Sequence, residues 1–220
     1  MMFNHVKIDL PDKLKRVEVG GKRYYQVPGT DEKLVSVTTV TSFQSAKSIN
    51  EWRMRVGAEE ANKITRQATR RGTDTHTLTE HYLNNEDLPK VDPLPHLLFT
   101  ISKQYLKNIN NIYALESPLY SLKLGIAGTV DCIAEYNGEL AVIDFKTSKQ
   151  PKPEQWIEGY FVQTVAYACM LYELTGIIVK KLVIIMTCEN GECVVYEKYN
   201  KSEYIRKLTQ YIREWKTANE

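Results

Sequence analysis

Gly128-Thr129-Val130-Asp131, followed by Val142-Ile143-Asp144-Phe145-Lys146-Thr147-Ser148, is the stretch that decides the fold of this chain. Both segments predict strands, and the Asn137-Gly138 pair between them predicts a tight hairpin turn. A hairpin brings Asp131 and Asp144 side by side. Two carboxylates this close repel each other by roughly 4 kcal/mol at about 4 Å and an effective dielectric near 20. The pair therefore predicts a divalent metal ion between them.

Lys146 shares a strand face with Asp144, because alternate residues of a strand point the same way, while Phe145 points into the opposite layer. Asp131, Asp144 and the backbone carbonyl of Phe145 offer hard oxygen ligands, which suit Mg²⁺ or Mn²⁺ with water completing an octahedron. Lys146 is then placed to orient or deprotonate a water bound to this ion. The competing interpretation is an exposed strand face with a cross-strand ion pair worth at most about 1 kcal/mol.

The composition narrows the class of protein. The 220 residues can bury a substantial core, and no linker or internal repeat divides them, so we expect a single domain. The net charge of +2 means that any affinity for nucleic acid must come from local clusters of positive charge. No apolar run is long enough for a signal peptide or a membrane span, which predicts a soluble, cytoplasmic protein.

Strand and helix patterns alternate along the chain in an order typical of an α/β core with a mixed sheet. An N-terminal hairpin around Gly20-Gly21 is expected at residues 17–27, followed by a short strand at residues 34–40. The expected helices are a stretch from residue 48 through residue 64 and residues 73–83, 95–112, 154–174 and 202–215. The expected strands of the core are residues 125–135, 139–145, 181–188 and 192–199, with a further strand that begins near residue 116.

Two motifs flank the Asp-x-Lys triplet, which alone would be weak because such triplets arise by chance. Gly72-x-x-x-His76 precedes it, and Gln163-x-x-x-Tyr167 follows it. In this order the motifs resemble those of the RecB-like branch of the PD-(D/E)xK nucleases. Within this branch the chain is similar to the family of mitochondrial genome maintenance exonucleases and their phage relatives. The resemblance extends from about Leu34 to the C-terminus. It is strongest in residues 115–117, 128–136, 142–153 and 163–167.

The resemblance implies a restriction-endonuclease-like α/β core, in which helices flank a mixed central sheet, with an N-terminal β hairpin and a helical arch. It divides the single nuclease domain 1–220 into three parts. These are a β appendage (residues 1–43), a helical region that carries the first metal ligand (44–113) and a catalytic αβ core (114–220).

The resemblance also implies how the metal is held. His76 would join Asp131 and Asp144 as a ligand, and its imidazole would tilt the site towards Mn²⁺. Glu80 lies one helical turn from His76 on the same helix face. Glu116 would hold a water of the metal shell or, like Glu80, serve a second ion. Taken alone, His76 would be interpreted as a surface or capping histidine, and Glu116 as a strand residue facing solvent.

The expected catalytic residues follow from the same resemblance. Gln163 and Tyr167 are four residues apart on one helix, where the family uses them to position the DNA backbone and the lysine. Without the other motifs, Tyr167 would be interpreted as a core residue. The full catalytic set is Lys146, Asp131, Asp144, Glu116, Gln163 and Tyr167.

A stretch from Trp52 to Arg71 interleaves aromatic and guanidinium side chains, which suits a channel that stacks bases and tracks phosphates. A solvated helix face is the alternative. In the relatives, a helical arch admits single-stranded DNA from a free end and excludes duplex, and residues 44–84 would form it here. The expected DNA-binding residues are Trp52, Arg53, Arg66, Arg70, Arg71, Thr147, Ser148, Lys149, Gln163 and Tyr167.

These expectations describe a metal-dependent exodeoxyribonuclease that trims single-stranded DNA or flaps from free ends, in replication, recombination or repair. The cofactor would be Mg²⁺ or Mn²⁺. The protein is expected to be a monomer in a bacterial cell or a phage-infected host, with single-stranded or flap DNA as its partner. The alternatives are a structure-selective endonuclease on the same fold and a nuclease-like binding module without catalysis.

Some RecB-like nucleases hold an iron–sulfur cluster with one N-terminal and three C-terminal cysteines. No cysteine precedes Cys132 in this chain, so no such cluster is expected. The cysteines form no Cys-x-x-Cys pair, and we expect buried or half-buried thiols. They are Cys132, Cys169, Cys188 and Cys193.

Overall fold

The predicted hairpin forms the middle of the sheet in the computed structural model, which describes residues 2–219. Strands β5 (Ile126–Tyr136) and β6 (Glu139–Ser148) pair antiparallel. Asn137 and Gly138 have positive φ values of 54° and 80°. A two-residue turn that matches the twist of its strands requires positive φ at both positions, so the predicted turn is confirmed.

One mixed sheet contains the eight strands formed by residues 2–219, in the order β1-β2-β3-β5-β6-β7-β8, with β4 paired to β5. Strand β5 is shared by three neighbours. β4 runs antiparallel along its length, β3 pairs with its first two residues, and β6 pairs with it only from Cys132 onward. The remaining strands are β1 (Lys15–Val19), β2 (Lys22–Gln26), β3 (Lys33–Ser36), β4 (Ile109–Ser121), β7 (Lys181–Cys188) and β8 (Cys193–Lys198).

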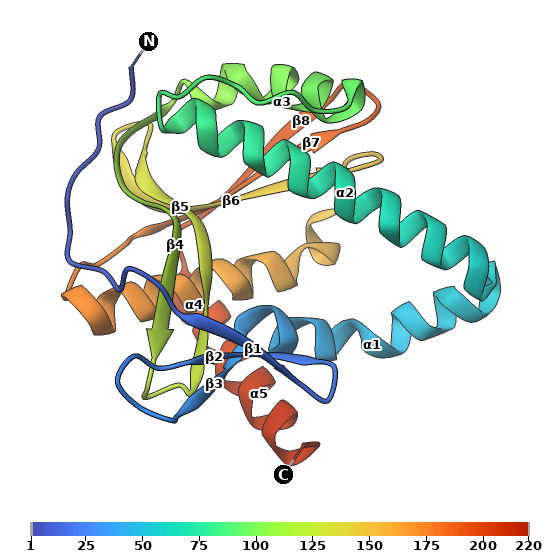
Figure 1. Ribbon diagram of the computed structural model, residues 1–220, viewed down its shortest axis with the longest axis vertical. Coiled ribbons are helices and arrows are strands. Elements are labelled where there is room, and N and C mark those ends of the chain that lie inside the picture. Colours follow the sequence, from blue (N-terminus) through green and yellow to red (C-terminus); the bar gives the residue numbers. More distant parts are fainter. Residues whose placement is uncertain (1, 220) are drawn as a thin grey trace.

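Helices cover both faces of this sheet (Figure 1). On one face, α4 (Glu158–Thr175) packs against β4, β6 and β7, and α5 (Lys201–Thr217) packs against α4. On the other face lie α2 (Ala58–Leu83), next to β6, and α3 (Pro93–Leu106), next to β7. After β6, the short 3₁₀ helix η1 (Glu154–Trp156) and α4 lead to the parallel strand β7. This crossover fixes the end of β6 against α4.

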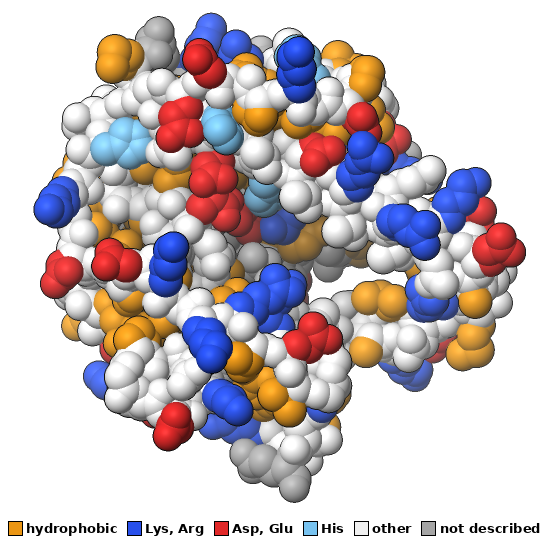
Figure 2. Space-filling view, viewed as in Figure 1, with side chains coloured by type: hydrophobic (Ala, Val, Ile, Leu, Met, Phe, Trp, Pro, Cys, Tyr) orange, Lys and Arg blue, Asp and Glu red, His pale blue; other side chains and the backbone are white. Residues whose placement is uncertain are grey.

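The long helices α1 (Val37–Val56) and α2 form a helical hairpin that projects from the rest of the molecule (Figure 1). Gly57, whose φ is 92°, separates the two helices. Few side chains can adopt this backbone conformation, so the glycine allows the sharp reversal. Figure 2 shows a hollow between the two helices, which opens next to a group of Asp and Glu side chains on the body of the protein. The helical arch expected from the sequence is therefore present.

Several expected boundaries differ from the structure. The helix expected from residue 48 through residue 64 is interrupted at Gly57, and the helix expected at residues 73–83 is the second part of α2, which begins at Ala58. The β-branched run that was expected to be a strand as far as Val40 becomes helical at Val37, because Val37 and Val40 share one buried helix face. The helix expected to reach Ile112 ends at Leu106, and β4 begins at Ile109. The divisions at residues 43 and 113 therefore fall inside α1 and inside β4. The N-terminal hairpin also continues into the main sheet through β3.

The described helices include none that is both long and apolar enough to cross a membrane. The four cysteines are free thiols, and Cys132 and Cys188 are buried, as the sequence predicts. Burial raises the pKa of Cys188 to about 11, so this thiol stays protonated at neutral pH.

Gly128 allows α4 to pack closely against the sheet. A Cβ atom at this position would lie 3.0 Å from Cε1 and 3.0 Å from the hydroxyl oxygen of Tyr167. The Tyr167 ring is only 2% exposed and belongs to the core between α4 and the sheet. The glycine thus leaves room for a large ring directly over β5, beside the strand positions that lead to Asp131.

Replacing Gly128 with alanine should lower the free energy of unfolding by about 1–3 kcal/mol, because the buried ring cannot move aside without strain. Gly159→Ala is the matched control, since nothing lies within 4 Å of the Cβ it would add in α4. Urea unfolding of both variants measures the effect. Equal stabilities for the two variants would contradict the packing argument, and a Tyr167→Leu background should reduce the cost of Gly128→Ala.

Candidate active site

Asp131 lies where β5 and β6 separate. The two strands pair up to Cys132 and Ile143, and beyond this pair the β6 backbone leaves β5. The Asp131 carboxylate fills the gap, because its Oδ2 accepts a hydrogen bond of 2.9 Å from the backbone N–H of Phe145. Asp131 is only 8% exposed, so the bond satisfies a buried amide that would otherwise lack a partner.

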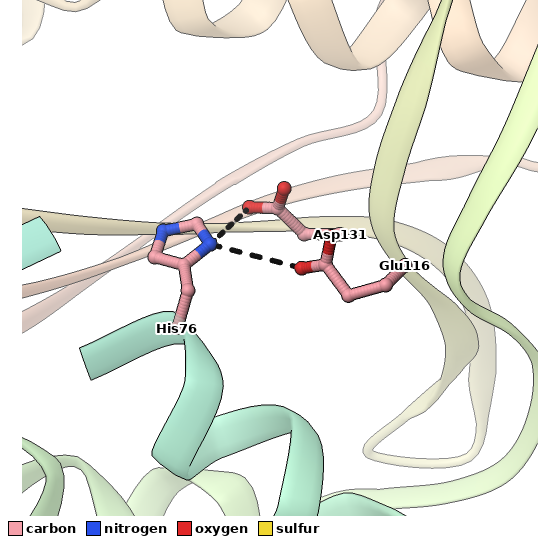
Figure 3. Close-up of side chains that lie close together, drawn as sticks. All are labelled: His76, Glu116 and Asp131. Atoms are coloured by element: carbon pink, nitrogen blue, oxygen red, sulfur yellow. Dashed lines mark ion pairs between the residues drawn. The ribbon is translucent and has the colours of Figure 1, made fainter. Parts of the chain in front are cut away.

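His76, Glu116 and Asp131 converge from three elements (Figure 3). Nδ1 of His76 on α2 lies 3.8 Å from Oε1 of Glu116 on β4 and 3.7 Å from Oδ2 of Asp131 on β5. One ligand atom from each residue lies within 4.8 Å of the others. Glu116 has a φ of 44°, a left-handed backbone conformation that is unusual for a residue other than glycine. This conformation occurs opposite Asp131, between the pairs formed by Leu115 and Ser117.

The second ring nitrogen fixes the orientation of His76. Its Nε2 lies 2.7 Å from the carbonyl oxygen of Phe145, so a proton on Nε2 donates to that carbonyl. In the neutral ring this leaves the Nδ1 lone pair directed at the acids, as a metal ligand requires. The Phe145 carbonyl was expected to bind the metal. In the structure it accepts the His76 hydrogen bond and thereby orients this ring, and its role as a metal ligand stays a prediction.

Asp144 is buried beside Lys146 and stands apart from the three converging residues. Its carboxylate is 1% exposed, forms an ion pair with the Lys146 ammonium, and has no hydrogen-bond donor of good geometry within residues 2–219. The Lys146 ammonium also lies 5.1 Å from the centre of the Tyr160 ring. A buried carboxylate with free lone pairs needs a further cation or donor, which a bound metal would supply.

The acidic residues of the site keep its basic residues positively charged. Burial disfavours a charged His76, but Asp131 and Glu116 outweigh burial and raise its pKa to about 9. Burial also disfavours a charged Lys146, but Asp144 and Asp131 raise the pKa of this ammonium above its usual value. Burial raises the pKa of Asp144, although Lys146 opposes this shift. Lys146 is therefore cationic at neutral pH and suited to orienting groups rather than removing protons.

The residues present fit a divalent metal ion. Two carboxylates and an imidazole converge, a third carboxylate has unused oxygen atoms, and the ligand set is mostly hard oxygen. His76, Glu116 and Asp131 form the compact group, whereas the sequence placed Asp144 with His76 and Asp131 and Glu116 further out. The ligand list itself stays a prediction.

The other predicted site residues surround this group. Glu80 lines a hollow of about 330 Å³ together with His76 and Glu116, one turn further along α2. Tyr167 is buried against Gly128, and burial together with Asp131 and Asp144 raises its pKa well above the usual value. Gln163 is half-buried one turn before Tyr167 on α4.

The predicted DNA-binding residues separate into two groups. Arg71 is only 11% exposed, because its guanidinium donates to Thr147 Oγ1 at 3.2 Å and forms an ion pair with Glu189. It ties the helix that carries His76 to the end of β6 and to the turn after β7. By contrast, the Arg70 side chain is 70% exposed, although it pairs with Asp92 at 2.9 Å.

The remaining members of this set are less constrained. Arg66 is exposed on α2, four residues before Arg70 and on the same helix face. Arg53 in α1 donates to Asn62 Oδ1 in α2 at 2.6 Å, so it links the two helices of the arch near Gly57. Trp52 is half-buried, Ser148 is buried and Lys149 is exposed.

Sequence reasoning missed Tyr160 and Lys152. The Lys152 ammonium donates to the Tyr160 hydroxyl at 2.7 Å, and the ammonium groups of Lys152 and Lys146 lie 5.2 Å and 5.1 Å from the centre of the Tyr160 ring. Tyr196 holds this arrangement by donating to the Lys152 carbonyl at 2.7 Å. The only sequence signal was the placement of Lys152 between two prolines and of Tyr160 three residues before Gln163, on one helix face.

Comparison with known proteins identifies the family. A model of the PD-(D/E)XK nuclease superfamily matches residues 94–219, more than half of the chain. The chain belongs to this superfamily. The family and the mixed α/β fold predicted from the sequence are both confirmed. His76 lies outside the matched residues, and α2 brings it to the PD-(D/E)XK core.

Curated relatives match over shorter segments. Human mitochondrial genome maintenance exonuclease 1 is 46% identical over 65 residues, which cover 28% of this chain and 18% of the human protein. The mouse protein of the same name is 39% identical over 84 residues, which cover 37% of this chain and 25% of the mouse protein. A solved structure of a proposed exonuclease from Eubacterium rectale aligns with a TM-score of 0.46 and 10% identity, over 66% of this chain and 63% of that one.

In metal-free protein, His76 should stabilise the fold most strongly at low pH. Its pKa is raised from an ordinary value of 6.5 to about 9 on folding, so its contribution is complete below 6.5 and is lost as pH rises through 9. The contribution is at most about 3 kcal/mol, because part of the side chain remains exposed. Urea unfolding of the parent and His76→Gln in chelator across this range measures it, and a pH-independent difference would contradict it.

Proposed function

We propose that this PD-(D/E)XK nuclease is a metal-dependent exodeoxyribonuclease that hydrolyses phosphodiester bonds of single-stranded DNA or flaps from free ends. The convergence of His76, Glu116 and Asp131 at the base of the arch carries this proposal. The Asp144–Lys146 ion pair lies beside the same strand gap. Roles in DNA replication, recombination or repair are consistent with the names of the curated relatives.

The arch supports a single-stranded substrate. The hollow between α1 and α2 leads to the acidic group (Figure 2), and the lining of the pocket beside it includes Gly72, His76 and Glu116. Arg66 and Arg70 lie on one face of α2, and Arg70 lines a neighbouring hollow with Thr147, Ser148 and Lys149, where these side chains would contact phosphates. A strand that passes between two helices must enter by an end, which favours an exonuclease.

His76, Glu116, Asp131 and Asp144 would hold Mg²⁺ or Mn²⁺. When bound, such an ion polarises a phosphate and lowers the pKa of a bound water. Lys146, kept cationic by Asp144, orients the attacking water and offsets negative charge on the phosphate. Tyr160 contacts the Lys146 ammonium with its ring. Gln163 and Tyr167 on α4 would help to position the lysine and the DNA backbone.

The alternatives make different predictions for a substrate panel. End-labelled single strand, duplex, 5′ flap, 3′ flap and covalently closed circle are incubated with Mg²⁺, Mn²⁺ or chelator. We expect shortening of the single strand and flaps, no cutting of the circle, and no activity in chelator. Cutting of the circle would establish a structure-selective endonuclease. Binding without cleavage of any substrate would establish a nuclease-like binding module.

Lys146→Ala should abolish cleavage while it retains most metal and DNA binding, because the ammonium acts on water and phosphate and is not a metal ligand. Asp144→Asn should lose both cleavage and metal binding. Calorimetric titration with Mn²⁺ separates the two variants, and nuclease assays give the second readout. An Asp144→Asn protein that binds metal like the parent would remove Asp144 from the ligand list.

Arg66 and Arg71 should differ in their effect on DNA binding. Arg66→Ala should weaken binding of single-stranded DNA. The slope of log binding constant against log salt concentration should become shallower by about 0.7, because one phosphate contact is lost. Arg71→Ala should leave the slope nearly unchanged but lower the melting temperature, because its guanidinium is occupied by Thr147 and Glu189. Fluorescence anisotropy at several salt concentrations and thermal unfolding test both. A change of slope in Arg71→Ala but not in Arg66→Ala would make Arg71 the phosphate contact and remove Arg66 from that role.

A further inference from the structure

An apolar groove lies between α4, α5 and the turn that joins β4 to β5. It has a volume of about 430 Å³. Several large apolar side chains on its walls are open to solvent: Tyr172 is 57% exposed, Ile178 is 63% exposed and Ile205 is 40% exposed. A cluster of exposed apolar side chains around a groove is typical of a surface that binds another molecule.

Basic side chains without acidic partners surround this groove. Lys123 and Lys201 line it, and Lys180, which is exposed, follows the lining residue Val179 in the sequence. Among residues 2–219, no carboxylate forms an ion pair with any of the three lysines. The ammonium of Lys201 donates to the carbonyl of Val179, and burial lowers its pKa. A carboxylate supplied from outside would offset the desolvation of this ammonium.

The acidic residue of the groove is already occupied. Oε1 of Glu173 accepts hydrogen bonds from the backbone N–H groups of Leu122, at 3.0 Å, and Lys123, at 3.3 Å. Its other oxygen accepts from the Ser121 hydroxyl. Glu173 therefore holds the β4–β5 turn in place and forms no ion pair with the lysines, and its single negative charge leaves the rim of the groove basic overall and the floor apolar.

The groove and the candidate active site lie on opposite faces of α4. Val165, Ala168 and Tyr172 recur at helical spacing on the groove side. Gln163 and Tyr167 are about half a helical turn away from this stripe, on the side that faces β5. A molecule held in the groove would leave the metal ligands open to DNA.

We propose that this groove binds an acidic peptide segment of a partner protein, with an apolar side chain in the floor and carboxylates on Lys123, Lys180 and Lys201. A second copy of this chain fits the surface poorly. A symmetric dimer across the groove would bring the lysines of both copies together, and this repulsion would act against association. An acidic partner is complementary in charge and in apolarity.

The test uses a fluorescein-labelled peptide with a run of aspartates followed by leucine and phenylalanine. One matched peptide carries lysines in place of the aspartates, and another carries serines in place of the apolar residues. We expect the parent protein to bind the first peptide only, with an affinity that falls as salt is added. Ile178→Asp and Lys123→Glu should each weaken binding about tenfold or more, and nuclease activity on single-stranded DNA should be unchanged.

Leu97→Asp is the control, because Leu97 is 51% exposed on α3 and is not a groove residue. It should bind the peptide like the parent. A dissociation constant above about 1 mM for the parent would overturn the proposal, as would equal binding of the lysine peptide or undiminished binding by Ile178→Asp. Salt-resistant dimerisation of the parent through this face, abolished by Ile178→Asp, would assign the groove to self-association instead. These outcomes are independent of catalysis.

Discussion

The hydrogen bond from the Phe145 amide to the Asp131 carboxylate is the interaction on which the site depends. It occurs where β6 leaves β5, so it replaces a backbone partner that the sheet no longer provides. The same residue then uses its carbonyl to orient His76. One break in strand pairing thus places a carboxylate from β5, a histidine from α2 and the following lysine of β6 around a common space.

The sequence was informative where local chemistry determines structure. The Asn137-Gly138 turn and the left-handed Gly176 at the end of α4 both follow from backbone preferences, and both are present. Local sequence patterns predicted the wrong secondary structure where tertiary contacts outweigh the intrinsic strand or helix propensity of the residues. Val37 and Val40 favour a strand by their branching, but their burial on one helix face prevails. Ile109 begins a strand because β5 supplies a partner along its entire length.

The sequence indicated which residues belong to the candidate site, but not which of them lie close together. The strand and hairpin patterns identified Asp131, Asp144 and Lys146, and the family resemblance added His76, but which acids converge depends on the angle at which β6 leaves β5. Glu116 joins the compact group, while Asp144 faces Lys146. The contact of Arg71 could not be predicted either, since its partner Glu189 lies in a turn far along the chain. No local pattern encodes a contact between such distant segments.

The left-handed conformation of Glu116 has an evolutionary consequence. A non-glycine residue with φ near 44° costs of order 1 kcal/mol or more, a cost that glycine would avoid and asparagine would reduce. Selection for stability alone would therefore replace this glutamate and remove an acid from the site. With the role proposed for Glu116, stability and activity oppose each other at this position. If variants of this nuclease are selected for stability without a functional screen, we expect substitutions of Glu116 to accumulate. These variants should lose function as their stability rises.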